Sequence, residues 1–202
     1  FVRAGLVIVS GLAMGIDAHC AHETLQTGGK TVAVLGHGLA SIHPKSNARL
    51  AEHIVTGGGL LLSEFPLDTV PDKYTFPARN RIIAGLTLGT VILEAGEGSG
   101  ALITAELALE YAREVFAVPG QMFDSHYVGC HQLIASGQAK LCVSASDVLQ
   151  DLGIVAPAKA KAVTHAPQNQ EEASLYDALT TMPQSVTELV TRAKLDAATV
   201  NA

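Results

Sequence analysis

The stretch LVIVSGLAMGIDAHCAHETLQ, residues 6–26, decides the fold class. It opens with an apolar, β-branched run over residues 6–9, passes through a glycine-containing turn, and continues with helical periodicity over residues 18–26. A strand that enters a helix through a tight glycine turn is typical of the βα unit of a parallel sheet. Asp17 stands at the start of this helix, where a carboxylate either caps the helix or fixes the preceding loop.

The same alternation continues along the chain. Further strand-like runs occupy residues 31–35, 60–63, 90–93 and 114–118. Their spacing of roughly 25 residues leaves room for a crossover helix each time, and continuous apolar strands are buried on both faces of a parallel sheet. The sequence therefore predicts a doubly wound, mostly parallel, Rossmann-like α/β fold. A helix over residues 102–112 is expected to turn Ile103, Leu107 and Tyr111 toward the core.

Composition shifts divide the chain into three parts. Residues 1–153 are expected to form the Rossmann-like domain, with its N-terminal part missing because the chain opens at Phe1 and runs directly into a strand. Residues 154–170 are rich in Ala, Pro, Lys and Gln and are typical of a linker. Residues 171–202 are predicted to form a truncated winged-helix-like segment, with an unstructured tail as the alternative; its helical stretches are 173–179, 186–193 and 197–200.

Charge and cysteine content exclude several classes of protein. The 202 residues carry a formal net charge of −6, so a nucleic-acid site has to be local rather than spread over the surface. The three cysteines form no CxxC pair, which argues against a zinc ribbon and a disulfide framework. The longest apolar stretch, residues 4–16, is too short to cross a bilayer. We therefore expect a cytoplasmic protein without a membrane segment.

The segment KYTFPARNR, residues 73–81, is predicted to form a loop and is the local basic patch of this acidic chain. It combines three cations with two aromatic residues and contains no acid. This composition suits the stacking of unpaired bases together with the neutralisation of the phosphates between them. The alternative interpretation is a solvated loop whose arginines pair with carboxylates such as Glu64 or Glu94.

Two glycine-containing turns follow predicted strands. The first contains Gly11 and Gly15, and the second contains Ser99 and Gly100. Backbone N–H groups at the start of a helix can bind an anion, although such glycines also serve tight turns for steric reasons alone. The second turn lacks the GK[ST] sequence of a Walker A loop and the GxSxG sequence of a nucleophile elbow. Neither phosphoryl transfer nor acyl transfer is therefore predicted.

Histidines do not define a metal or catalytic site in the sequence. His19 and His22 stand three residues apart on a predicted helix, but no third ligand has supporting spacing. The other histidines are scattered, and none pairs in sequence with a nucleophile and an orienting acid. We predict no catalytic residue, no metal and no cofactor.

Taken together and in order, several segments resemble the DprA/Smf family of DNA-processing proteins, over about residues 5–150. The combination of FPARNRIIAGL and SGALIT is the most specific part of the resemblance. The matching segments are VSGLAMGID (9–17), AVLGHGL (33–39), HPKSN (43–47), LSE (62–64), FPARNRIIAGL (76–86), EAGEGSGALIT (94–104) and VFAVPG (115–120).

The resemblance implies a non-enzymatic protein, often dimeric, that binds and protects single-stranded DNA and helps to load the RecA recombinase during natural transformation. It implies that Lys73 and Arg79 hold phosphates and that Phe76 stacks a base. A family arginine in a Gly-Ser-Arg turn would lie upstream of Phe1. The DNA site implied for this chain consists of Gly11, Gly15, Lys73, Phe76, Arg79, Asn80, Arg81, Ser99 and Gly100.

Two positions depart from the family pattern: Met14 replaces a basic residue, and His43 replaces a tyrosine before proline. Two alternative functions match the sequence only in part. A nucleotide phosphoribohydrolase of the lysine-decarboxylase-like group is similar around residues 99–106 but would need a Pro-Gly-Gly start that is absent. A dinucleotide-binding module would need GxGxxG after the first strand and an acid after the second, and neither is present.

Overall fold

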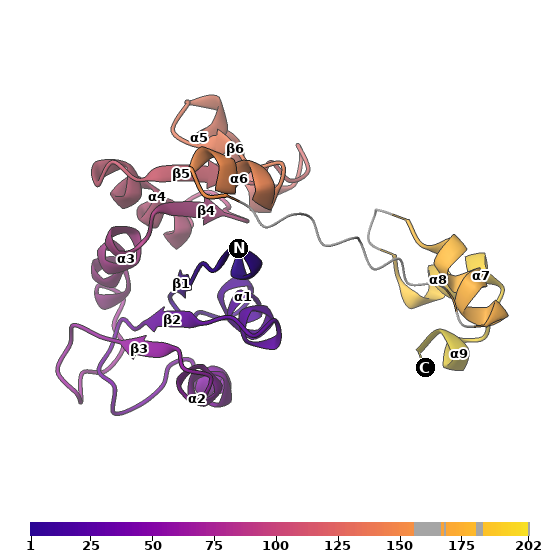
Figure 1. Ribbon diagram of the computed structural model, residues 1–202, viewed down its shortest axis with the longest axis horizontal. Helices are drawn as coiled ribbons and strands as arrows, with labels where there is room; N and C mark the ends of the chain where they lie inside the picture. The colour runs from indigo at the N-terminus through magenta and orange to yellow at the C-terminus, as the bar shows by residue number, and fades with distance from the viewer. Residues whose placement is uncertain (156–166, 168, 181–183, 202) are drawn as a thin grey trace. The chain divides into compact units, whose positions relative to one another are not determined.

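The first βα unit sets the pattern of the fold. Strand β1 (Ile8–Ser10) ends at the glycine turn, and α1 (Ile16–Gln26) returns along the sheet to β2 (Thr31–Val34), which pairs with β1 in parallel through Ile8 opposite Thr31. The computed structural model describes residues 1–155, 167, 169–180 and 184–201, and divides into the units Phe1–Ala158 and Lys159–Ala202 (Figure 1).

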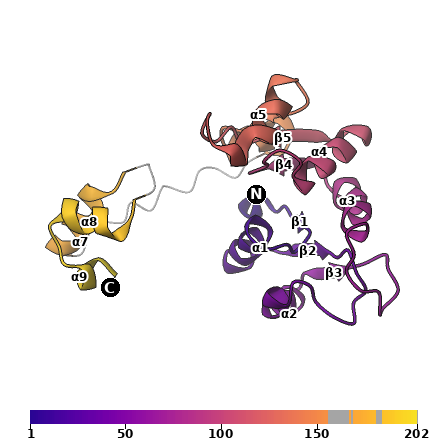
Figure 2. The ribbon, with the colours of Figure 1, turned by 180° about the vertical axis from the view of Figure 1, so that it is seen from behind.

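The described part of the first unit contains two three-stranded parallel sheets, ordered β1-β2-β3 and β4-β5-β6. Figure 2 shows the two sheets from behind, with α3 beside both. The remaining elements are η1 (Val2–Ala4), η2 (Lys45–Asn47), α2 (Ala48–Thr56), β3 (Leu60–Leu62), α3 (Thr75–Leu86), β4 (Gly89–Ile92), α4 (Gly100–Glu110), β5 (Glu114–Ala117), η3 (Ser125–Tyr127), α5 (Val128–Ala135), β6 (Lys140–Leu141) and α6 (Ala145–Asp151). The predicted Rossmann-like α/β class is confirmed, and β6 is a strand that the sequence pattern did not reveal.

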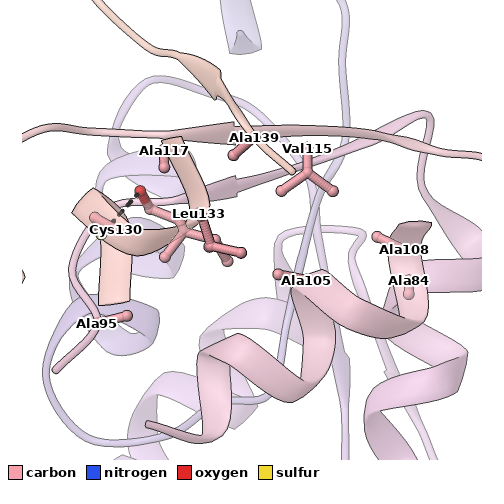
Figure 3. Close-up of a cluster of buried hydrophobic side chains, with 10 residues drawn as sticks. Ala84, Ala95, Ala105, Ala108, Val115, Ala117, Cys130, Leu133 and Ala139 are labelled. Carbon is pink, nitrogen blue, oxygen red and sulfur yellow. Dashed lines mark hydrogen bonds between the residues drawn. The ribbon is translucent and has the colours of Figure 1, made fainter. Parts of the chain in front are cut away.

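Each sheet has its own buried core. The first cluster belongs to β1–β3 and contains Leu12, Ala21, Ala33, Leu35, Ala51 and Ile54. The second belongs to β4–β6, and Figure 3 shows most of it, with the Cys130 thiol directed at a backbone carbonyl. Small side chains dominate this second core, because α3 and α4 lie against each other through residues such as Ala84, Ala105 and Ala108.

The prediction that Ile103 and Tyr111 face the core is wrong. Ile103 and Tyr111 are 36% and 43% exposed, whereas Ala105 and Ala108 are fully buried. A closely approaching helix leaves room only for small residues at the contact, so helix α4 turns its alanines inward.

A second correction concerns residues 73–81, which the sequence suggested as a loop. Helix α3 begins at Thr75, so most of the basic segment is helical. Pro77 stands in the first turn, where proline is tolerated because the N–H groups there have no intrahelical partner. Asp72 orders the turn before it, since its carboxylate accepts a hydrogen bond from the Tyr74 N–H at 2.9 Å.

An apolar cleft of roughly 990 Å³ lies between β1 and β4, the facing strands of the two sheets. Its walls come from both strands and from the helices next to them, with Ile8, Cys20, Val91 and Leu152 among the lining residues. In the described residues β1 pairs with β2 and β4 pairs with β5, so the edges toward the cleft have no strand partner.

The described residues of the second unit form α7 (Gln170–Ala178), α8 (Val186–Ala193) and α9 (Ala197–Asn201). Helix α8 begins with a capping box in which Ser185 and Glu188 bond reciprocally, and it ends at Lys194 in a left-handed conformation. The winged-helix-like assignment stays a prediction. The predicted linker, residues 154–170, lies mostly outside the described residues. Among those described, no helix combines the length and the apolar character needed to cross a membrane.

Candidate nucleic-acid interface

Arg79 joins two turns at the carboxyl ends of β1 and β2. Its guanidinium donates hydrogen bonds to the carbonyl oxygen of Gly11, at 3.0 Å, and to that of Val34. The side chain is 6% exposed. Burial lowers the pKa of the guanidinium, and the Asp17 carboxylate acts in the opposite direction. An arginine remains charged under these conditions, so Arg79 is a buried cation held by backbone carbonyls.

These contacts give Arg79 a structural role that its sequence position did not reveal. The resemblance implies that its guanidinium holds a phosphate, and in the structure its Nη1 donates to the Gly11 and Val34 carbonyls while its Nε donates to the Asn80 side-chain oxygen. Gly11 is required for the contact, because a Cβ there would lie 2.5 Å from a guanidinium nitrogen of Arg79. Arg79 therefore holds the backbone at the ends of β1 and β2 in place, and its contact with a phosphate stays a prediction.

Two further side chains fix the first glycine turn. The Asp17 carboxylate accepts hydrogen bonds from the N–H groups of Gly11, at 2.8 Å, and Ala13, at 3.2 Å. The Asn47 amide donates to the carbonyls of Leu12, at 3.0 Å, and Ala13, at 3.2 Å. Of the two roles considered for Asp17, fixing the loop is the one observed. Helix α1 is instead preceded by Gly15, whose φ of 82° suits glycine.

Asn80 connects the same helix to the second glycine turn. Its amide donates to the Gly100 carbonyl at 3.3 Å, while its side-chain oxygen accepts from the Arg79 Nε at 3.1 Å. Ser99 caps α4 by accepting from the Ala101 N–H. The adjacent residues Arg79 and Asn80 thus tie the turns at Gly11 and Gly100 to the first half of α3.

The exposed part of the basic segment begins at Lys73. Its ammonium lies 4.9 Å from the ring centroid of Tyr74, which is 72% exposed. Among the described residues, no carboxylate lies within ion-pair distance of Lys73. Arg81, in contrast, is paired with Glu64 on the surface. Pairing with a surface carboxylate, the alternative considered for this segment, is therefore observed for Arg81. Lys73 is an exposed cation beside an aromatic ring.

Phe76 is half-buried and lies against the loop that follows β2. A Cβ on Gly36 would be 2.8 Å from the Phe76 ring, and the ring of His43 has its centroid 6.2 Å from that of Phe76. His43, like Asn47, was given no role from the sequence alone. Both belong to the HPKSN segment, and only the fold brings that segment to α3 and to the first glycine turn.

Thiols and metal-binding groups contribute little to this region. Cys20, Cys130 and Cys142 are free, and burial is the main cause that raises the pKa of each thiol. In the part of the chain that the structure describes, no group of three or more histidine, cysteine or acidic side chains is placed to hold a metal ion.

The fold and this region define a Rossmann-like α/β protein with a preformed cluster of loops at the carboxyl ends of its strands, where open parallel sheets bind ligands. The family model for DNA recombination-mediator protein A matches residues 1–153. The chain belongs to this family, the DprA/Smf proteins.

Curated relatives agree with this assignment. The chain is 52% identical over 146 residues to DNA processing protein DprA of Streptococcus pneumoniae, covering 72% of this chain and 51% of that protein. It is 49% identical over 148 residues to protein Smf of Escherichia coli, covering 73% of this chain and 39% of that protein. The chain thus spans about half the length, or less, of these relatives.

Solved structures agree as well. The crystal structure of DNA processing protein A from Streptococcus pneumoniae has a TM-score of 0.68 and 49% identity, and the match covers 74% of this chain and 52% of that one. The Helicobacter pylori protein, whose structure was described for its single-stranded DNA binding mode, has a TM-score of 0.59 and covers 72% of this chain and 79% of that one. At 24% identity, this second likeness shows the fold alone.

Proposed function

We propose that this chain binds single-stranded DNA, without turnover, at the start of α3 and the two glycine turns beside it. The observation that carries the proposal is the position of Lys73, an exposed cation next to an exposed aromatic ring and three residues before Phe76. The family membership and the name of its DNA-processing relatives support the same role.

Each residue of the proposed site would have its own role in binding the strand. Lys73 neutralises a phosphate, and the positive end of the α3 dipole favours the same anion. Phe76 provides a face for an unpaired base, which is a sequence-tolerant contact because every base has one. Arg79 and Asn80 keep the turns at Gly11 and Gly100 in register with α3. Gly15, Arg81 and Ser99 remain proposed members of the site at its edges.

The test is fluorescence anisotropy of a labelled oligothymidine, with a duplex of the same length for comparison, over a salt series. We expect tighter binding of the single strand, weakening with salt because phosphate contacts release counterions. Lys73→Ala should reduce affinity several-fold and lower the salt slope by about 0.7, the value for one phosphate contact in a single strand. Lys30→Ala is the matched control, because the exposed Lys30 lies just before β2, at the end of that strand away from the proposed site.

Two results would overturn the proposal. One is a folded sample with no affinity for the oligothymidine at low salt. The other is release of free base from a nucleoside monophosphate, because that reaction would indicate the phosphoribohydrolase alternative instead of a binding protein.

Loading of RecA, assembly as a homodimer, protection of incoming DNA in natural transformation and a cytoplasmic location are further proposals that follow from the family. They concern the whole protein, of which this chain represents part. Stimulation of RecA-dependent ATP hydrolysis on single-stranded DNA, and sedimentation of the full-length protein, would test the first two.

A further inference from the structure

We propose that His43 and Phe76 hold one unpaired base of the bound strand between their rings. The inference rests on the single-strand binding proposed above and specifies how that site takes a base. The ring centroids are 6.2 Å apart, and the ring planes are inclined at 41°. Rings on either side of a base lie about 7 Å apart, twice the roughly 3.4 Å spacing of nucleotides along a strand. The pair therefore needs to open by less than about 1 Å, with one ring turning toward the other.

Phe76 is the fixed wall of this slot. A Cβ on Gly36 would lie 2.8 Å from the Phe76 ring and 3.2 Å from its Cα, so the aromatic residue rests directly on the loop after β2. Arg79, one helical turn later, fastens the same helix to that strand through the Val34 carbonyl. Since both its ring and its backbone are supported, Phe76 presents a preformed face.

His43 is the adjustable wall. Its main chain is anchored, because the His43 N–H donates to the Nε2 of His37 at 3.3 Å. His37 is 1% exposed, and its Nδ1 lies 2.8 Å from the Gly38 carbonyl, which assigns the proton to Nδ1 and leaves Nε2 as the acceptor. The imidazole of His43 is exposed, so it can reorient to lie parallel to a base while its backbone stays in place.

A lysine lies close in sequence to each of the two rings. Lys73 precedes Phe76 by three residues, and Lys45 follows His43 by two. Both lysines are exposed, and neither is in an ion pair among the residues that the structure describes. A nucleotide whose base enters the slot has a phosphate on each side, so each wall brings a charge suited to one of them. Stacking between two rings also explains how the site would accept any base.

The experiment measures oligothymidine binding by His43→Ala, His43→Phe and His43→Lys, with His53→Ala on α2 as the matched control. Loss of one stacking face corresponds to about a 5- to 150-fold loss of affinity, so His43→Ala should fall in this range. His43→Phe should bind within a few-fold of the native chain, because it keeps the ring. His43→Lys, which adds a cation without a ring, should not restore binding. An oligothymidine with one 2-aminopurine should lose fluorescence on binding to the native chain and to His43→Phe, and less on binding to His43→Ala.

The outcomes separate the slot from the proposed function. If Lys73→Ala weakens binding while His43→Ala binds like the native chain, the DNA site stands and the slot is wrong. If His43→Lys restores binding and His43→Phe does not, His43 acts as a cation and the slot is again wrong. If the native chain does not bind single strands at all, the proposed function fails, and the slot with it.

Discussion

Replacing Arg79 by methionine tests whether this residue organises the site. The change keeps an unbranched side chain of similar length but removes the donors that satisfy the Gly11 and Val34 carbonyls. Leaving a buried polar group unsatisfied costs about 1–3 kcal/mol, so two carbonyls imply a loss of about 2–6 kcal/mol in the free energy of unfolding. For a domain of this size, such a loss lowers Tm by about 4–24 °C.

Arg81→Met is the control two residues later on the same helix. Arg81 lies on the surface, paired with Glu64. An exposed ion pair contributes about 0–1 kcal/mol, so this variant should melt within a few degrees of the native chain. Thermal and urea unfolding followed by circular dichroism would compare the two. Equal stability of Arg79→Met and Arg81→Met would refute the structural role of the buried guanidinium.

DNA binding supplies an independent measurement on the same variant. If Arg79 only positions the turns, Arg79→Met should bind oligothymidine more weakly while the slope of log affinity against log salt stays unchanged. A residue that contacts a phosphate contributes about 0.7 to that slope. A drop of this size in Arg79→Met would show that its guanidinium reaches the DNA directly, which is the role the sequence first suggested.

Three further predictions concern other parts of the chain. Gly38→Ala should lower Tm measurably in calorimetry, because its Cβ would lie 2.1 Å from a carbonyl oxygen of the facing loop. Gly85→Ala in α3 is the contrasting variant: its Cβ would make only ordinary contacts, so it should stabilise the protein by about 0.5–1 kcal/mol. The Asp124 carboxylate raises the pKa of His126, so in an NMR titration His126 should keep its proton to higher pH than a free imidazole. The stability that the pair contributes is lost as pH rises through the pKa of His126. Asp124→Asn should lower this pKa. Ser185→Ala should destabilise α8 by about 1 kcal/mol, visible as faster amide exchange in that helix, and unchanged exchange would contradict the capping role.

The order of strands and helices could be predicted because it depends on local periodicity. The apolar runs at residues 6–9, 31–35, 60–63, 90–93 and 114–118 all became strands, within a few residues at each end. The two-residue β6 was missed because so short a strand has no periodicity to detect. The start of α3 was missed because its aromatic, basic and proline residues favour a loop interpretation, while its tertiary contacts favour a helix.

Site geometry could be predicted only where it depends on residue type. The composition of residues 73–81 pointed to a cation beside an aromatic ring, and Lys73 with Tyr74 fits that pattern. It could not distinguish the exposed Lys73 from the buried Arg79, because the partners of Arg79 are carbonyls 45 and 68 residues away. His43 and Phe76 are likewise far apart in sequence, so nothing local predicts that their rings meet.

The separate cores under the two sheets imply that the first unit opens in two steps. One hydrophobic cluster uses residues between Leu12 and Ile54, and the other uses residues between Ala84 and Ala139, with no member in common. The central strands β2 and β5 should then hold the slowest-exchanging amides of two different sets, while the amides of β1 and β4 that face the cleft exchange fast. Arg79 fastens α3 to the first half, and α3 packs on α4 of the second. Native-state hydrogen exchange should therefore find two cooperative units that are coupled through α3, both by the hydrogen bonds of Arg79 and by the packing of Phe76 on the loop after β2.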